Sequence, residues 1–207
     1  VELHQHLKGK AAREKTLEYL RDVGIADPEV RFAQYPHEFS GGMRQRVVIA
    51  IAVACNPQIL ICDEPTTALD VTIQAQILEL MKKLKTQYDT SLLMITHNLG
   101  IISELCENVS VVYGGRIIEY GSVQEVFGHP MHPYTVGLLG AIPSLEGKKD
   151  RLNAIPGQIA NATNLPKGCA FHPRCHECRA CCETEQPDMI RINDHHYVAC
   201  FCHKEVE

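Results

Sequence analysis

The sequence lacks any long run of apolar residues. Its longest such run, Val47 to Cys55, falls well short of the ~18 apolar residues that predict a membrane-spanning helix. It also lacks a signal peptide and any excess of positive charge, because 20 Lys and Arg face 25 Asp and Glu and the formal net charge is −5. This balance does not favour nucleic acid as a partner. The chain opens with Val1 rather than Met, so we expect a fragment of a longer protein.

Length and composition favour a globular protein. The chain has 207 residues, of which 45% are hydrophobic, enough for a real core. At roughly 150 residues per domain, this length predicts one domain and an additional segment. No internal repeat or low-complexity tract is visible.

The ten cysteines are distributed unevenly. Cys55, Cys62 and Cys106 stand singly in apolar surroundings, where small buried side chains are expected. The other seven lie between Cys169 and Cys202. Without a secretory signal, such a cluster indicates metal binding more than disulfides.

Helical and strand patterns alternate along the first two thirds of the chain. Apolar spacing predicts helices at 10–23, 71–87 and 100–106. Short continuous apolar runs at 58–62 and 91–96 predict buried parallel strands. The stretch after Arg46 is ambiguous, since its β-branched residues favour a strand while its alanines and the cap Ser40 favour a helix.

Gly114-Gly115 predicts a hairpin between two further strands, 109–113 and 116–120. The whole pattern predicts an α/β fold with a mainly parallel sheet. Near residue 128 the pattern breaks into a proline-, histidine- and cysteine-rich sequence. We therefore predict two domains, 1–128 and 129–207.

Three sequence features are suited to nucleotide chemistry. Ser40-Gly41-Gly42 precedes a possible helix, whose unpaired N–H groups can bind an anion, although such a triplet is also common in ordinary loops. Asp63-Glu64 ends a buried strand, where one carboxylate could hold Mg²⁺ and the other could orient water, or both could lie in a solvated turn. His97 ends the next strand, where its ring could contact a phosphate or could have a purely structural role.

The order and spacing of these features resemble the ATP-binding cassette (ABC) family. Phe39-Ser-Gly-Gly-Met-Arg-Gln-Arg resembles its signature, Ile59-Leu-Ile-Cys-Asp-Glu-Pro-Thr-Thr-Ala-Leu-Asp70 its Walker B motif and D-loop, and Ile95-Thr-His97 its switch histidine. The resemblance implies a partial P-loop NTPase domain.

It also implies a role for each motif residue. Asp63 would hold Mg²⁺ through water, Glu64 would be the catalytic base and His97 would sense the γ-phosphate of ATP. Asp70 would connect paired sites, and Gln45 and Arg46 would support the signature helix. The resemblance further implies that three residues contact ATP bound by a second subunit, namely Ser40, Gly41 and Gly42.

No G-x-x-x-x-G-K-[S/T] loop, whose N–H groups and lysine cradle phosphates, occurs in the sequence. Family resemblance puts that loop upstream of the segment present. Because it makes most of the charge contacts of such a site, we expect the 207-residue chain alone neither to bind ATP tightly nor to hydrolyse it.

The remainder of the chain resembles the extension of oligopeptide and dipeptide importers. The resemblance begins at His129-Pro-Met-His-Pro-Tyr-Thr and continues through Gly168-Cys-Ala-Phe-His-Pro-Arg-Cys175 to His196-Tyr-Val-Ala-Cys200. It implies a four-iron four-sulfur (4Fe-4S) cluster, with zinc as the alternative. The ligands carried over from the family are Cys169, Cys175, Cys182 and Cys200.

Three more cysteines, Cys178, Cys181 and Cys202, exceed this pattern. Cys175, Cys178 and Cys181 even form a C-x₂-C-x₂-C run of ferredoxin-like spacing, so the choice of ligands stays open.

Taken together, the resemblance implies the ATPase subunit of a peptide importer at the cytoplasmic face of the membrane. Its partners would be a second ATPase subunit, transmembrane permeases and, indirectly, an extracytoplasmic peptide-binding protein. Three alternatives remain: a nickel or other small-solute importer of the same group, a soluble ABC protein, and a non-enzymatic metal-binding remnant.

Overall fold

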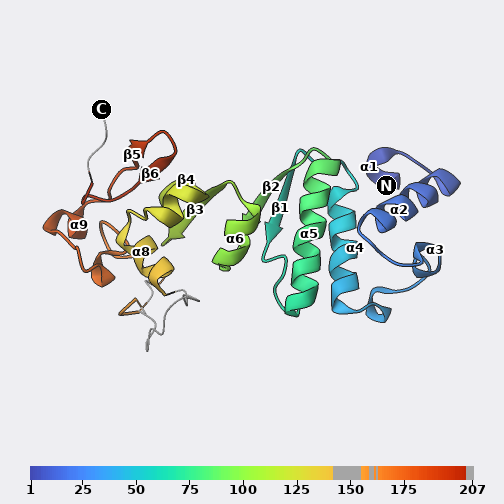
Figure 1. Ribbon diagram of the computed structural model, residues 1–207, viewed down its shortest axis with the longest axis horizontal. Helices are drawn as coiled ribbons and strands as arrows, with labels where there is room; N and C mark the ends of the chain where they lie inside the picture. Colours follow the sequence, from blue (N-terminus) through green and yellow to red (C-terminus); the bar gives the residue numbers. More distant parts are fainter. Residues whose placement is uncertain (142–154, 159–160, 162, 204–207) are drawn as a thin grey trace. The chain divides into compact units, whose positions relative to one another are not determined.

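The computed structural model describes residues 1–141, 155–158, 161 and 163–203. The chain packs into two compact units, Val1–Leu105 and Cys106–Glu207 (Figure 1). The domain boundary predicted near residue 128 falls inside the second unit, and as a statement about domains it stays a prediction. Within the described residues, no helix combines the length and apolar character needed to cross a bilayer.

The first unit is an α/β structure with a parallel strand pair. Strands β1 (Ile59–Asp63) and β2 (Ser91–Ile95) pair in parallel, with Ile59 opposite Ser91 and Asp63 opposite Ile95. This unit, all of whose residues are described, has seven helices: α1 (Glu2–Gln5), α2 (Gly9–Asp22), α3 (Pro28–Arg31), η1 (Pro36–Glu38), α4 (Gly41–Val53), α5 (Val71–Gln87) and α6 (Leu99–Leu105). Figure 1 shows α5 next to the strand pair and α4 beyond it.

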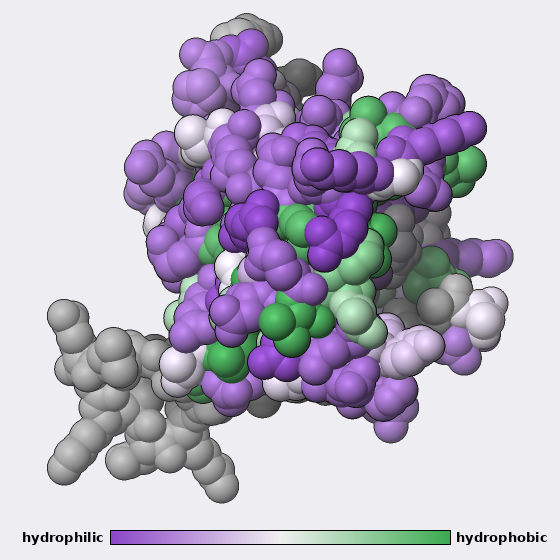
Figure 2. Space-filling view, turned by 90° about the vertical axis from the view of Figure 1, so that its right-hand side faces the viewer, coloured by the Kyte–Doolittle hydropathy of each residue, from purple (hydrophilic) through white to green (hydrophobic). Residues whose placement is uncertain are grey.

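The ambiguous stretch after Arg46 is helical, as α4. Ser40 is its N-cap, and Ile49, Ala50 and Val53 share the buried face that helical spacing produces. These side chains join one core cluster with α2, β1 and α5. Packing of this face therefore outweighs the strand propensity of the valines and isoleucines. The outer surface around α2 and α3 is mainly hydrophilic, with scattered apolar side chains (Figure 2).

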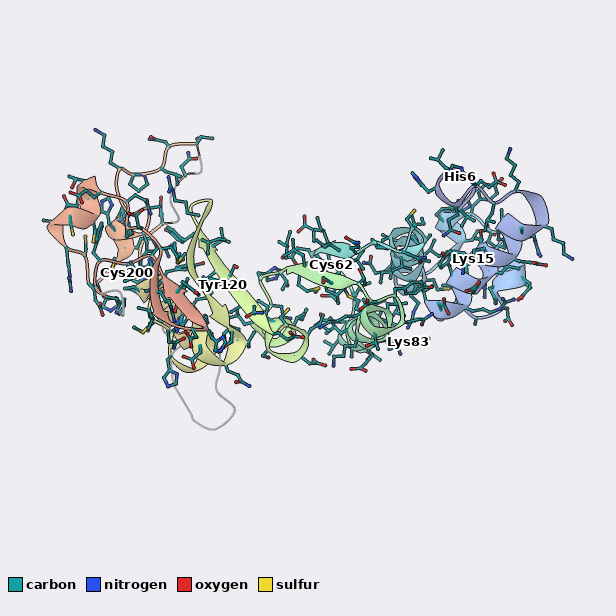
Figure 3. The ribbon with its side chains drawn as sticks, turned by 90° about the horizontal axis from the view of Figure 1, so that it is seen from above. His6, Lys15, Cys62, Lys83, Tyr120 and Cys200 are labelled. Atoms are coloured by element: carbon teal, nitrogen blue, oxygen red, sulfur yellow. The ribbon has the colours of Figure 1, made fainter. Side chains whose placement is uncertain are left out.

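The two parallel strands are packed on one face only, which corrects the prediction of fully buried strands. Leu60 and Cys62 of β1 point into the core, whereas Ile61 is 64% exposed and Leu93 of β2 is 52% exposed. Figure 3 labels Cys62 on its strand. The reason is that the described helices cover a single face, while parallel sheets normally have helices on both.

The second unit is built on a four-stranded antiparallel sheet of order β3-β4-β6-β5. The predicted hairpin is confirmed: Gly114 and Gly115, both at positive φ, join β3 to β4. The strands are β3 (Asn108–Tyr113), β4 (Arg116–Ser122), β5 (Ile190–Asn193) and β6 (His196–Val198). The helices are α7 (Val123–Gly128), α8 (Pro133–Gly140), η2 (His172–Arg174) and α9 (Ala180–Thr184).

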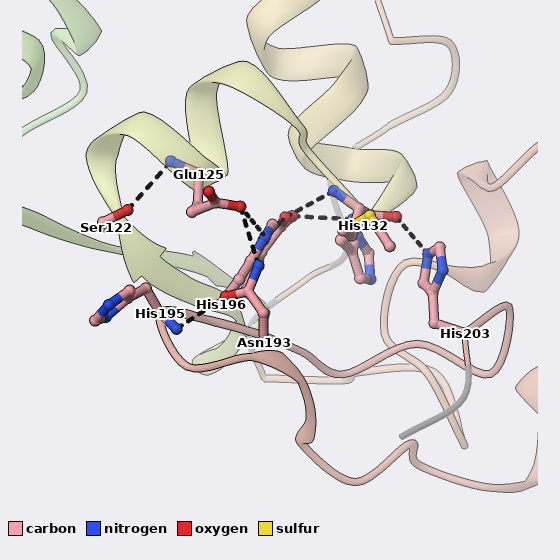
Figure 4. Close-up of polar contacts among 9 residues, drawn as sticks. Ser122, Glu125, His132, Asn193, His195, His196 and His203 are labelled. Atoms are coloured by element: carbon pink, nitrogen blue, oxygen red, sulfur yellow. Dashed lines mark hydrogen bonds and ion pairs between the residues drawn. The ribbon is translucent and has the colours of Figure 1, made fainter. Parts of the chain in front are cut away.

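A buried polar cluster joins this hairpin to the following loop and to β6 (Figure 4). The Glu119 carboxylate, 0% exposed, accepts hydrogen bonds from the backbone N–H groups of Met131 (2.7 Å) and His132 (2.9 Å). Its Oε1 also lies 2.7 Å from His196 Nε2. These contacts supply partners for a carboxylate that would otherwise be costly to bury.

His132 caps α8 from within the same cluster. Its Nδ1 accepts a hydrogen bond from the Tyr134 N–H at 3.0 Å, which requires an unprotonated nitrogen. Burial lowers the pKa of His132 to about 4, so the ring is neutral at pH 7. The His-Pro-Tyr sequence thus starts a helix and supplies a backbone donor to Glu119.

Candidate functional site

The first candidate site lies at the carboxyl end of β1. Asp63 is the last residue of the strand, and Glu64 follows it with a left-handed backbone (φ 46°). This unusual conformation is held by the Glu64 N–H, which donates to the Ile95 carbonyl at 2.9 Å. The Thr67 hydroxyl donates to Glu64 Oε2 at 2.8 Å. The turn therefore fixes the Glu64 carboxylate at the strand end.

The structure brings His97 onto Glu64, as the sequence predicts. His97 Nδ1 lies 2.7 Å from Glu64 Oε1, and the His97 backbone N–H donates to the same oxygen at 3.3 Å. The hydrogen bond from the His97 side chain, followed by that from Thr67, lowers the pKa of Glu64. An ionised carboxylate only accepts hydrogen bonds, so Nδ1 carries the proton and Nε2 is left available. The pair is open to solvent, with side-chain exposures of 84% for His97 and 37% for Glu64.

The other two carboxylates occupy different positions. The Asp63 side chain is exposed at the end of β1, beside the start of the Glu64 turn. Asp70 is the N-cap of α5, and its Oδ1 accepts a hydrogen bond from the Ile73 N–H at 2.9 Å. The cap uses one carboxylate oxygen, so Asp70 has a structural role independent of any ligand.

The Ser40-Gly41-Gly42 segment forms the exposed start of α4. Ser40 Oγ accepts from the Met43 N–H at 3.3 Å, which leaves its hydroxyl proton free to donate. Gly42 is required by packing, because a Cβ there would lie 2.8 Å from Ile73 Cγ2. Among the described residues, no hydrogen bond joins this segment to Glu64 or His97.

Arg46 links α4 to neighbouring segments. Its guanidinium donates to the Val23 carbonyl at 2.7 Å and to Gln76 Oε1 at 3.2 Å. The neighbouring Gln45, predicted to support this helix, is half-buried in α4. No side-chain hydrogen bond of Gln45 occurs within the part of the chain that the structure describes.

The second candidate site is a small cavity in the cysteine-rich tail. It has a volume of about 10 Å³, roughly the space for one water molecule. All four predicted ligands line it, and so does the additional Cys202. Figure 3 labels Cys200 in this part of the fold. The four predicted ligands are Cys169, Cys175, Cys182 and Cys200.

Burial controls the chemistry of these thiols. It raises the pKa of Cys175 to about 11 and that of Cys200 to about 12, and it also raises the pKa of Cys169. The Cys202 thiol, which lines the same cavity, adds to each of these three rises in pKa. Without a cation, the thiols therefore stay protonated.

Gly168 allows the two ends of the cavity to meet. The Cys169 N–H donates to the Cys182 carbonyl at 2.9 Å, and a Cβ at Gly168 would lie 2.4 Å from that carbonyl oxygen. Gly168 also has φ +67°, a backbone conformation that glycine tolerates best.

The cavity brings the four predicted cysteines together, but metal binding itself stays a prediction. Among residues 1–141, 155–158, 161 and 163–203, which the structure describes, no group of three or more His, Cys, Asp or Glu side chains is arranged to hold a metal ion as it stands. The ferredoxin-like alternative is less favourable, since neither Cys178 nor Cys181 lines the cavity. Of the three single cysteines, Cys62 is buried as expected, whereas Cys106 is half-buried and Cys55 is exposed, contrary to expectation.

Comparisons with known proteins match the two parts of the chain to two different family models. Residues 2–67 match the ABC transporter family, and residues 118–182 match the family described as "Oligopeptide/dipeptide transporter, C-terminal region". A solved structure of an ATP-binding cassette of an ABC transporter, MJ1267 in its ADP conformation, has a TM-score of 0.54 at 24% identity. It covers 64% of this chain and 51% of that one, and it supports the fold alone.

Curated relatives align along nearly the whole chain. The oligopeptide transport ATP-binding protein AppD of Bacillus subtilis is 50% identical over 202 residues, 98% of this chain and 62% of AppD. OppD of the same organism is 52% identical over 196 residues, 94% of this chain and 55% of OppD. A putative peptide import ATP-binding protein of Brucella ovis is 48% identical, over 100% of this chain and 63% of that protein. The chain thus spans about three fifths of the relatives' length, and its two parts match the ABC transporter family and the oligopeptide/dipeptide transporter C-terminal region.

Proposed function

We propose that this chain is part of the ATP-hydrolysing subunit of a peptide-import ABC transporter. The observation that carries the proposal is the contact of His97 with Glu64 at the ends of two parallel strands. Open α/β sheets bind ligands at this edge. The names of the relatives, which are oligopeptide or peptide import ATP-binding proteins, supply the substrate class.

The residues would divide the reaction as follows. Asp63 would hold Mg²⁺, which would supply positive charge beside the phosphates, and Glu64 would accept a proton from the water that attacks the γ-phosphate of ATP. A lowered pKa keeps Glu64 ionised and ready to accept that proton. His97 contacts the γ-phosphate through Nε2, which needs a second ring proton because Nδ1 already donates to Glu64.

The signature segment would act on a different nucleotide. Ser40, Gly41 and Gly42 contact ATP bound by a second ATPase subunit, through a free hydroxyl proton and exposed N–H groups at the start of α4. Gln45 supports this helix. Asp70, through its position at the start of α5 beside the signature glycines, links the two sites.

The partners follow from this arrangement. A second ATPase subunit completes each site, and closure of the pair moves transmembrane permease subunits at the cytoplasmic face of the membrane. A peptide-binding protein outside the membrane delivers the substrate to those permeases. ATP and Mg²⁺ are the cofactors of the site.

We also propose that the tail binds a 4Fe-4S cluster through Cys169, Cys175, Cys182 and Cys200, with zinc as the alternative. The donor set supports this, because four thiols converge on one cavity and thiolates suit iron–sulfur clusters and zinc. The group would fasten together a small unit whose own core is limited. Iron, sulfide and zinc analysis of anaerobically purified protein distinguishes the cluster from zinc and from an empty site.

The ATPase proposal is tested by Glu64→Gln in a subunit as long as the curated relatives. The variant should lose steady-state ATP hydrolysis while retaining nucleotide binding, since the amide cannot accept the water proton. Glu14→Gln, at an exposed glutamate of α2, is the matched control and should hydrolyse ATP normally. Unchanged turnover in Glu64→Gln would reject Glu64 as the base and favour a non-enzymatic remnant.

A further inference from the structure

The cysteine cavity has one thiol more than a four-thiolate site requires. Cys200 and Cys202 both line it, on either side of Phe201. They belong to a turn that follows β6, in which the His203 N–H donates to the Cys200 carbonyl at 3.4 Å. Both thiols of this Cys-x-Cys turn therefore face one cavity, unlike Cys178 and Cys181, which do not line it.

The turn is fixed relative to another predicted ligand. The Arg179 guanidinium donates to the Phe201 carbonyl at 2.9 Å, and the Arg179 backbone N–H lies 3.4 Å from Cys182 Sγ. A single residue thus positions both the turn and Cys182. The hydrogen bond from Arg179 to the Phe201 carbonyl therefore positions Cys200 and Cys202 relative to Cys182.

Cys202 is held only weakly where it lies. Its Sγ lies 3.8 Å from the Glu177 carbonyl oxygen, and a thiol is a weak donor. Moving this side chain toward the cavity therefore costs little. Cys202 already lines the same small cavity as Cys169, Cys175 and Cys200, so its side chain has only a short distance to move.

We infer that Cys202 is a reserve ligand of the metal centre, able to replace Cys200 at the same coordination position. The inference rests on the proposed cluster. In the exchange, the bond from Cys200 Sγ to iron breaks and one from Cys202 Sγ forms. Cys202 releases its thiol proton to solvent and Cys200 takes one up, so no electrons are transferred and no oxidant is needed.

The experiment compares Cys200→Ser, Cys202→Ser and the double variant in the full subunit, purified anaerobically. Cys178→Ser, an exposed thiol outside the cavity, is the control, and Cys182→Ser represents a ligand without a reserve. Iron and acid-labile sulfide per chain, the visible absorbance and the electron paramagnetic resonance spectrum of the reduced protein are measured. Far-ultraviolet circular dichroism identifies variants that fail to fold.

Cys200→Ser should keep most of its iron and sulfide but show an altered resonance spectrum, because one ligand has moved. Cys202→Ser and Cys178→Ser should match the unmodified protein, while Cys182→Ser and the double variant should lose most of the metal. A folded Cys200→Ser protein as empty as the double variant would overturn the reserve ligand alone. Unmodified protein without iron and sulfide would instead overturn the proposed cluster, and the reserve ligand with it.

Discussion

The His97 ring and the Glu64 carboxylate meet across two parallel strands, with Nδ1 and Oε1 2.7 Å apart. Replacing His97 by alanine removes the interaction that does most to lower the pKa of Glu64. We therefore expect the pKa of Glu64 to rise toward its ordinary value of 4.5 in His97→Ala, and by less in Thr67→Ala. Carbon-13 NMR titration of the side-chain carboxyl measures both shifts.

The lowered pKa of Glu64 also sets the direction in which stability changes with pH. Because the pKa of Glu64 is lower in the folded chain than in the unfolded chain, its contribution to stability is fully present above the unfolded value and is lost as pH falls through the folded value. His97→Ala should weaken this part of the acid dependence. An identical Glu64 titration in the variant and the unmodified chain would contradict the contact.

Glu119 offers a test of the buried polar cluster in the second unit. Glu119→Gln replaces an acceptor of three groups and removes the nearer carboxylate partner of His196, which is 1% exposed; Glu125 Oε2 remains 3.9 Å from His196 Nδ1. Removing one partner of a buried pair typically costs about 3–5 kcal/mol, so we expect a loss of this size in the free energy of unfolding. Denaturant titration measures it. Glu185→Gln, an exposed glutamate beside α9, should change stability by less than ~0.5 kcal/mol.

Alanine substitutions at Gly168 and Gly115 distinguish a steric clash from backbone strain. In Gly168→Ala the new Cβ meets the Cys182 carbonyl, and the residue also keeps a positive φ. Gly115→Ala has a positive φ of +76° but no neighbour within 4 Å, so it isolates the strain, of order 1–3 kcal/mol. We expect Gly168→Ala to destabilise the chain more than Gly115→Ala. Equal unfolding free energies for the two variants would show that the tail does not require this close approach.

Gly42 can be tested for packing separately from nucleotide contact. Gly42→Ala places a Cβ 2.8 Å from Ile73 Cγ2, so we expect it to destabilise the first unit. Ile73→Ala removes Cγ2, and in that background Gly42→Ala should cost less. Four unfolding free energies complete the double-mutant cycle. Additive costs would mean that Gly42 is not required by this contact.

Because one face of the parallel strands is exposed, we expect substitutions at adjacent residues of β1 to differ in their cost to the free energy of unfolding. In the 207-residue chain, Leu60→Ala should cost about 2–5 kcal/mol, because Leu60 packs in the core. Ile61→Ala, at a side chain 64% exposed, should cost less than ~0.5 kcal/mol. Denaturant titration compares the two. A large cost at Ile61 would show that this face is covered.

The sequence by itself determined the order of the elements and much of the candidate chemistry. Apolar spacing is a local property, so the helix at 71–87 and the two parallel strands follow from it, and Gly114-Gly115 specifies its hairpin through backbone conformation alone. The Glu64–His97 pair was predictable too, because residues at the carboxyl ends of neighbouring parallel strands meet at one edge of the sheet.

Only tertiary structure decided the features that depend on distant partners. The stretch after Arg46 became a helix because one of its faces packs in the core, a fact absent from its own propensities. Glu119 binds three groups in segments 12 to 77 residues away along the chain. Folding also places Cys202 in the lining of the cysteine cavity, and Cys178 and Cys181 outside it. Burial and close approach arise from contacts between segments far apart in sequence, and no local pattern records them.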